Sequence, residues 1–478
     1  MTLRAQLPVV LLLLAAPQPA QAADLKKPFQ VAGENGVELR EAVQRTPEDQ
    51  RAAMEFLIAH MPERDLKTLS ADYLLENVEL AYQAWREAPW HEQVSESLFL
   101  NNILPYASIN ERRDNWRPSF FKEFAPLVKD AESPGEAAAI LNNNVFKMLN
   151  VKYSTKRRKA DQSPLESIES GLASCTGLSV LLIDACRAVG VPARFVGTPL
   201  WSDRSGNHSW VEVWDDGWRF TGAAEPSGME LDRGWFVGRA ARAQRDHRLF
   251  AIYATSFKRT PLTFPMVWDR DASYVSAVNV TDRYTADKQD LPAGKGYARF
   301  RVLDETGERV SCQLEVVDED DGEICFEGAT RDERFDGNDH LSATLSLGKT
   351  YTATAAHEGR TVSTTVKLDA DEQLYTIALL AVGSDAADNE ASGDDPLAAL
   401  KTFLATPRDE RADIAAQGFA DVALNQEQAA TAQEMLWADH RTWIKASRAA
   451  EMEARELVDG ELKMPFAYSV FGDMPEEG

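Results

Sequence analysis

The chain has 478 residues, with 76 Asp and Glu side chains against 51 Lys and Arg, and a formal net charge of −25. Binding to nucleic-acid phosphates or anionic membranes depends on clustered Lys and Arg, so this charge argues against both partners. Four cysteines are too few for a disulfide-stapled scaffold, and no Cys-x-x-Cys pair suggests a zinc or redox motif. The length corresponds to two to four domains.

The N-terminus has the pattern of an export signal. Arg4 precedes an apolar run over 7–16, and Ala20-Gln21-Ala22 supplies the small residues of a cleavage site. The run is shorter than the roughly 20 residues needed to span a bilayer, and no later segment is apolar enough to be transmembrane. We therefore predict a signal peptide and a periplasmic or secreted protein, with an uncleaved anchor as the alternative.

The rest of the chain predicts a multi-domain α+β protein. The pattern is helical between about 29 and 129. An example follows Ser70, a good helix-start residue, with Leu74, Val78 and Ala81 on one face. Runs such as 313–317 alternate as in an antiparallel β-sandwich, of the immunoglobulin-like or carboxypeptidase-regulatory-like kind. In chain order the predicted parts are a signal peptide (1–22), an N-terminal helical region (23–129), a mixed core (130–274), the β-sandwich (275–382), an acidic linker (383–396) and a helical tail (397–478).

The stretch from 171 to 236 carries the candidate chemistry. Ser174 and Cys175 precede a helical run that ends at Gly190 and Pro192, so Cys175 is predicted in the first turn of a buried helix. The helix dipole favours a thiolate there. His208 stands at the entry of a predicted strand, and a thiol beside an imidazole is the pair that acyl transfer needs. Taken alone, a cysteine at a helix start is more often a small buried apolar residue.

Three blocks, at 171–177, 186–194 and 207–214, resemble the transglutaminase-like superfamily, which is papain-like in architecture. The superfamily includes transglutaminases, peptide N-glycanases and bacterial cysteine proteases and amidases. The resemblance is firm over 164–236 and looser over 61–161, where the helices resemble exported bacterial members. It implies that Cys175 is the nucleophile and His208 the general base, acting on a protein or peptide substrate. We expect no cofactor and no metal.

The third catalytic group departs from the family pattern. The family usually places an aspartate a few residues after the strand's tryptophan, where this chain has Gly222. Glu225 is the candidate that would orient the imidazole, with Asp232 as a weaker alternative. If neither acid reaches His208, the enzyme would be slow or inactive. The backbone N–H of Cys175 is an expected oxyanion donor.

Aromatic and charged residues near the motif have structural and functional interpretations. Trp201 and Trp210 are candidates for the substrate cleft, although most tryptophans between 201 and 235 should be core residues. Arg194 and Glu212 are expected to have a structural role, through a buried pair or through contacts at the strand ends. The basic run 156–159 is interpreted as a solvated loop, or alternatively as a surface that attracts an acidic substrate.

The other three cysteines are expected to have structural roles. Cys186 follows Cys175 by eleven residues, about 16 Å along a helix, so it belongs to the core. Cys312 and Cys325 flank the acidic turn 318–321, and a hairpin centred there predicts a disulfide between them. The turn does not have EF-hand spacing, so we interpret it as solvated rather than as a calcium site.

Together these features predict an exported transglutaminase-like cysteine enzyme. It would cleave or transfer a peptide or carboxamide acyl group through a Cys175 thioester, and we favour hydrolysis over crosslinking because water is the default acceptor. The alternative is a catalytically inactive binding module, held by its β-sandwich at a partner in the cell envelope or extracellular matrix.

Overall fold

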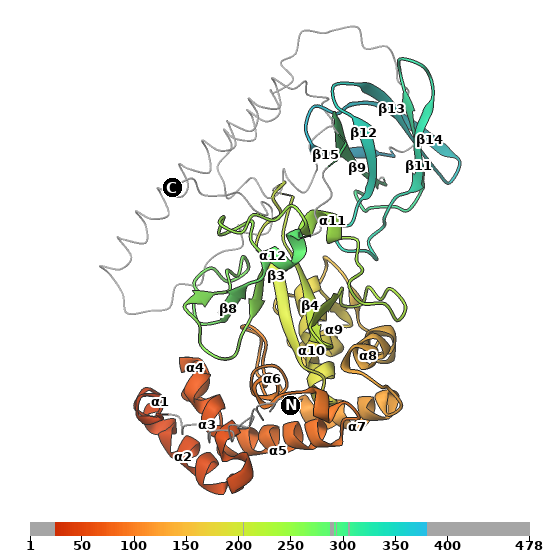
Figure 1. Cartoon of the computed structure of the whole chain (residues 1–478). Coiled ribbons are helices and arrows are strands. Elements are labelled where there is room, and N and C mark those ends of the chain that lie inside the picture. The colour runs from red at the N-terminus through yellow and green to blue at the C-terminus, as the bar shows by residue number, and fades with distance from the viewer. Residues whose placement is uncertain (1–23, 204, 287–290, 293, 305, 380–478) are drawn as a thin grey trace, which may run out of the picture. The chain divides into compact units, whose positions relative to one another are not determined.

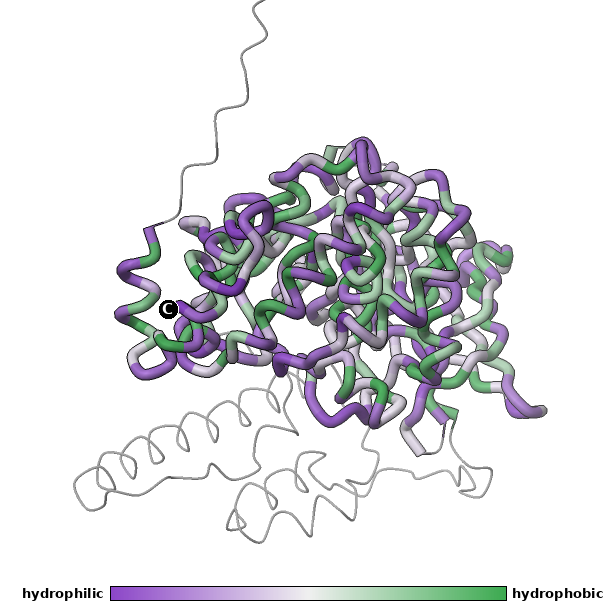
Figure 2. The backbone as a smooth tube through the Cα atoms, turned by 90° about the horizontal axis from the view of Figure 1, so that it is seen from below, coloured by the Kyte–Doolittle hydropathy of each residue, from purple (hydrophilic) through white to green (hydrophobic). Residues whose placement is uncertain are grey.

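The computed structural model describes residues 24–379, except 204, 287–290, 293 and 305, and they lie in one compact unit of the chain (Figure 1). The predicted signal peptide, linker and helical tail fall outside the described residues. Within the described part, no helix is both long and apolar enough to cross a membrane. In Figure 2 hydrophobic and hydrophilic segments alternate along most elements, as expected where one face of each is buried.

The predicted N-terminal helical region is present. Ser70 begins the longest of its helices, since its side chain accepts a hydrogen bond from the Tyr73 amide. Leu74, Val78 and Ala81 are buried on the inner face of that helix, as the periodicity predicts. The helices are α1 Lys26–Ala32, α2 Gly36–Arg45, α3 Arg51–His60, α4 Glu63–Leu66, α5 Ala71–Glu87, α6 Glu96–Asn102 and α7 Arg117–Val128.

The core that follows is built around one buried helix, α10 Cys175–Ala188. Every residue of α10 from Thr176 to Ala188 is buried, because α7, α8 and α9 pack on it together with β3 and β4 (Figure 1). The other core helices are α8 Pro134–Met148, α9 Pro164–Ser170, α11 Val237–Ala240 and α12 Thr281–Thr285.

A six-stranded antiparallel sheet supports this helix, in the order β5-β4-β3-β6-β8-β7. A separate parallel pair, β1 with β2, leads into α10. The strands are β1 Lys152–Tyr153, β2 Leu172–Ala173, β3 Ala193–Thr198, β4 His208–Trp214, β5 Trp218–Thr221, β6 Tyr253–Thr255, β7 Leu262–Thr263 and β8 Ser276–Asn279. The core sheet thus continues past the predicted boundary at 274, because β8 is too short to show a pattern in the sequence.

A buried ion pair holds the central strands together. Arg194 on β3 lies opposite Glu212 on β4, and their side chains approach to 2.6 Å. Tyr284 of α12 donates a second hydrogen bond to the Glu212 carboxylate, at 2.8 Å. The predicted structural role of the pair is confirmed.

The predicted β-sandwich is also present, with two sheets ordered β11-β10-β13-β14 and β12-β9-β15. Its strands are antiparallel, as predicted, except that β15 pairs with β9 in parallel. Phe300, Val316 and Tyr351 are buried between the sheets. The strands are β9 Lys295–Leu303, β10 Gln313–Asp318, β11 Ile324–Ala329, β12 Leu341–Ser346, β13 Thr350–His357, β14 Arg360–Lys367 and β15 Glu372–Ala378.

The predicted disulfide between Cys312 and Cys325 is wrong, since both thiols are free. The register of the hairpin explains this. The Cys312 carbonyl accepts a hydrogen bond from the Thr330 amide, and the Cys312 amide donates to the Thr330 hydroxyl. Cys325, in contrast, is exposed in a bulge opposite Val316 and Val317. The two cysteines therefore lie at different heights along the strands.

The turn after α10 needs a glycine. Gly190 has a φ of +81°, and a Cβ there would lie 2.5 Å from the Ala84 carbonyl oxygen. We expect Gly190→Ala to lower the free energy of unfolding by about 2 kcal/mol or more, because a left-handed backbone alone costs about 1–2 kcal/mol. Urea unfolding measures this. Gly238→Ala in α11 is the control, since a Cβ there meets no atom within 4 Å, and equal losses in both variants would contradict the prediction.

Candidate active site

Cys175 is the first residue of α10, as the sequence predicts. Ser174 caps the helix by accepting a hydrogen bond from the Gly177 amide at 3.1 Å, and its own hydroxyl donates to the Ala160 carbonyl. Cys175 is half-buried, so it is the one residue of α10 that reaches the surface. The partial positive charge at a helix N-terminus stabilises an anion at this position.

His208 is the first residue of β4, where it meets the start of α10. The hydroxyl groups of Thr176 and Ser209, the residues that follow Cys175 and His208, lie 3.1 Å apart. The imidazole is packed among aromatic rings, with the centroid of Trp235 at 4.7 Å and that of Phe236 at 5.0 Å. The structure therefore brings the predicted nucleophile and base together.

A third group, the carboxylate of Asp336, completes the cluster. Cys175 Sγ, one ring nitrogen of His208 and one oxygen of Asp336 all lie within 4.8 Å of one another. The distance from His208 Nδ1 to Asp336 Oδ2 is 3.5 Å, which is an ion-pair contact rather than a well-formed hydrogen bond. A linear relay through both imidazole nitrogens would hold sulfur and oxygen more than about 6 Å apart. The three groups therefore form a triangle.

Asp336 comes from the β-sandwich, in the loop between β11 and β12. Its Oδ1 accepts hydrogen bonds from the backbone amide of Asn338 at 2.9 Å and from the side chain of Asn338 at 3.3 Å. The Asn338 side chain also donates to the Asn207 carbonyl at 3.0 Å, and the Gly337 amide donates to the hydroxyl of Tyr153 on β1 at 2.8 Å. These bonds hold the loop against the core. The sequence shows only a polar turn here, so Asp336 could not be found from it.

The surroundings of His208 and Asp336 favour the charged forms of both side chains. Burial by itself would lower the pKa of His208, but the Asp336 carboxylate and the Cys175 side chain raise it well above its usual value. Burial would raise the pKa of Asp336, and the charge of His208 and the Asn338 hydrogen bonds lower it below its usual value instead. The imidazolium and carboxylate forms are thus favoured together.

The structure places Glu225 near the site but not on the imidazole. Its Oε2 accepts a hydrogen bond from Trp235 Nε1 at 3.0 Å, and the acid in contact with His208 is Asp336. A Cβ at Gly222 would lie 2.4 Å from Glu225 Oε2. The Glu225 carboxylate therefore fills the space into which a side chain at 222 would project. Burial raises the pKa of Glu225 to about 7, although His208 lowers it.

Asp232, the other acid considered, serves a turn. It accepts hydrogen bonds from the Phe220 amide at 2.9 Å and from Arg219 at 3.1 Å. Both contacts tie it to β5, so it takes part in local structure.

Trp201 and Trp210 form an aromatic wall rather than an open cleft. Both are buried, and their rings are parallel at 6.3 Å. Trp210 donates to the Tyr284 hydroxyl at 2.8 Å, which places it in the core. Trp201 stacks at 6.1 Å from the His208 ring.

The basic run 156–159 is mostly paired with acids. Lys156 contacts Glu308, Arg158 lies 3.7 Å from Glu169, and Lys159 lies 3.1 Å from Glu166. These pairs favour the interpretation as a solvated loop.

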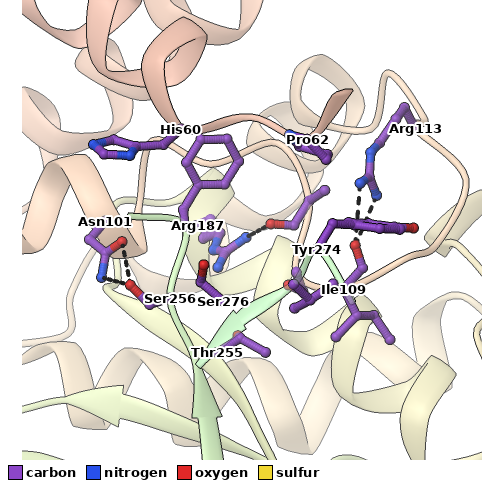
Figure 3. Close-up of a pocket in the computed structure, with 14 residues that line it drawn as sticks. His60, Pro62, Asn101, Ile109, Arg113, Arg187, Thr255, Ser256, Tyr274 and Ser276 are labelled. Carbon is purple, nitrogen blue, oxygen red and sulfur yellow. Dashed lines mark hydrogen bonds between the residues drawn. The ribbon is translucent and has the colours of Figure 1, made fainter. Parts of the chain in front are cut away.

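A small cavity lies elsewhere, between the N-terminal helices and the core sheet (Figure 3). His60, Asn101, Arg187 and Tyr274 are among the residues that line it, and its volume is about 40 Å³. This is room for a few water molecules. Cys175 and His208 do not line it, so it is not the place where they would meet a substrate.

The Asp336→Asn variant tests the ion pair between His208 and Asp336. We expect the pKa of His208, followed by NMR, to fall because burial is no longer opposed by the carboxylate. Because the pKa of His208 is raised in the fold, the stabilisation that His208 contributes is fully present below about pH 6.5. Because the pKa of Asp336 is lowered, the stabilisation that Asp336 contributes is fully present above about pH 4. The loss in free energy of unfolding should therefore be largest between these values. It should shrink as the pH rises through the folded-state pKa of His208 or falls through that of Asp336.

Asp339→Asn is the matched control, since Asp339 lies in the same loop but pairs with Arg331 at 3.4 Å. It should leave the His208 titration nearly unchanged. An unaltered titration in Asp336→Asn would contradict the ion pair.

Comparison with known proteins points to one family. Residues 123–223 match the family model described as the transglutaminase-like superfamily. No curated protein matches the chain.

Solved structures similar to the chain share little sequence with it. A protein from Cytophaga hutchinsonii, named as a candidate cysteine protease, is 18% identical with a TM-score of 0.20, covering 35% of this chain and 58% of that one. The TIE protein of Bacillus anthracis is 15% identical with a TM-score of 0.15, and the match covers 40% of this chain and 30% of that one. Red sea bream transglutaminase is 8% identical with a TM-score of 0.24, and the match covers 59% of this chain and 66% of that one. The chain spans less than two thirds of each.

The family match covers the elements that hold the site. Residues 123–223 include α8, α9, α10, β3 and β4, and with them both Cys175 and His208. This part of the chain is therefore a transglutaminase-like core.

Proposed function

We propose that the protein is an exported cysteine enzyme that cleaves or transfers a peptide or carboxamide acyl group. The observation that carries this proposal is the meeting of Cys175, at the N-terminus of a buried helix, with the His208 imidazole at the start of β4. The family match of the surrounding core supports it.

The proposed reaction runs through a thioester. Transfer of the Cys175 proton to the neutral form of His208 gives a thiolate and the imidazolium that Asp336 stabilises. The sulfur then attacks the substrate carbonyl to form a tetrahedral oxyanion. The backbone N–H of Cys175 donates to that oxyanion. The carbon–nitrogen bond then breaks, and the imidazolium gives its proton to the leaving amine. Water attacks the thioester with His208 as base, which releases the acid and restores the thiol. An amine in place of water would give transfer, and we favour hydrolysis because water is more abundant.

Two acids support His208 in this scheme. Asp336 stabilises the imidazolium by contact. Glu225 is proposed as a positioning residue that acts through Trp235, whose indole N–H it accepts and whose ring lies 4.7 Å from the imidazole. Its carboxylate fills the space at Gly222 where the resemblance implies an acid.

A non-catalytic binding module is the second candidate. It is favoured by the burial of the site, since the side chains of His208 and Asp336 are each only 1% exposed. In that case the β-sandwich would hold the protein at a partner in the cell envelope or extracellular matrix.

Thiol labelling tests the nucleophile. We expect iodoacetamide to modify Cys175 well below pH 8, because the helix N-terminus and His208 stabilise the thiolate. His208→Ala should remove this reactivity. Cys325, an exposed thiol on β11, is the internal reference in the same protein. If Cys175 is labelled only over the pH range in which Cys325 reacts, the proposal that His208 activates Cys175 is contradicted. Peptide profiling of the wild type against Cys175→Ala then identifies the substrate and the acceptor.

Glu225→Met tests the positioning role, because it removes both acceptor oxygens and keeps a side chain of similar length. We expect labelling of Cys175 to slow about tenfold, which corresponds to about 1.4 kcal/mol, the size of one hydrogen bond. The midpoint of its pH profile should stay in place, because Asp336 still contacts the imidazole. Trp235→Phe, which removes the indole N–H, should have the same effect. A wild-type rate in both variants would exclude the role.

A further inference from the structure

The triangular arrangement of Cys175, His208 and Asp336 has a second chemical use. The acyl-transfer scheme needs the thiol and imidazole in contact, but it does not need a carboxylate within 4.8 Å of the sulfur. Three different donor atoms converging on one point are what a transition-metal ion requires.

We propose that Cys175, His208 and Asp336 form a zinc-binding site and that Zn²⁺ bound there blocks the nucleophile. The blocking role rests on the proposed function, whereas the site itself does not. A thiolate sulfur, an imidazole nitrogen and a carboxylate oxygen are the three kinds of protein ligand that zinc uses.

The distances fit such a site with little movement. Tetrahedral zinc, with bonds of about 2.0–2.3 Å, sets its ligand atoms roughly 3.5 Å apart. His208 Nδ1 and Asp336 Oδ2 already have a separation of 3.5 Å. No pair among the three ligand atoms exceeds 4.8 Å. Rotation of the Cys175 side chain could close the remaining gap.

The surroundings leave the ligand atoms available. Neither ring nitrogen of His208 has a hydrogen-bond partner in the described structure, although the side chain is 1% exposed. Asp336 is anchored through Oδ1 by Asn338, so Oδ2 can bind an ion without losing that support. Cys175 is half-buried, so an ion would reach the site from the side of its sulfur.

Zinc binding would couple the β-sandwich to the nucleophile. The ion joins Asp336, from the loop between β11 and β12, to Cys175 on α10 through direct bonds. Because zinc binds the thiolate and the neutral imidazole, binding releases protons to solvent and strengthens as the pH rises. A chelator would reverse it.

The test measures zinc affinity directly on the untagged full chain after removal of metal. In competition with a chromophoric chelator, the wild type should bind one Zn²⁺ tightly. Asp336→Asn should bind it about 10- to 100-fold more weakly, and Cys175→Ser and His208→Ala at least as weakly. Asp339→Asn, in the same loop but outside the triangle, should bind like the wild type. Zinc should also protect Cys175 from iodoacetamide, and EDTA should restore labelling.

The outcomes separate the two proposals. Absence of stoichiometric binding, or affinity unchanged by Asp336→Asn, would overturn the zinc site. Labelling of Cys175 in EDTA, compared between the wild type and His208→Ala, reports on the activated thiol whether or not zinc binds. A protein can therefore fail one test and pass the other.

Discussion

The burial of α10 on all sides is the constraint on which the rest of the described structure depends. Helices α7, α8 and α9 and the strands β3 and β4 cover the helix, and only its first residue reaches the surface. A helix covered in this way has one fixed orientation, so the position of Cys175 is set by the whole core. The hydroxyl contact between Thr176 and Ser209 then fixes the start of β4, and with it His208.

Buried arginines bind this helix to the N-terminal region. Arg187 of α10 donates to the carbonyls of Asn102, Pro105 and Ala107, and Arg117 of α7 donates to the Arg187 carbonyl. These bonds satisfy the backbone of the loop after α6, which would otherwise be buried without partners. The N-terminal helices are thus part of the support of the core.

One acid in this region carries no hydrogen bond. Asp184 is fully buried, and burial raises its pKa well above the usual value despite the nearby charge of Arg187. The neutral form of Asp184 is therefore favoured over the ionised form. Ionisation would bury a carboxylate that accepts no hydrogen bond, with Arg187 4.0 Å away.

The sequence predicts what depends on local pattern. The helical run after Ser174, its end at Gly190 and Pro192, and the alternating strands of the sandwich are all short-range signals. The elements that they predict are confirmed. Cys175 and His208 were found because both lie at the start of such elements. Asp336 cannot be identified from the sequence, because its position depends on how a loop of the sandwich packs on the core. The disulfide prediction is wrong because a bulge between β10 and β11 changes which residues lie opposite each other.

The supply of Asp336 by the sandwich makes the site depend on two separate parts of the chain. The thiol and imidazole belong to elements that pair within the core, whereas the third group is held by bonds from Asn338 and Gly337 to Asn207 and Tyr153. The core by itself therefore supplies the thiol and the imidazole, and the loop of the sandwich supplies the buried counter-charge. Without that loop His208 would be a buried imidazole with no carboxylate in contact, and burial would lower its pKa.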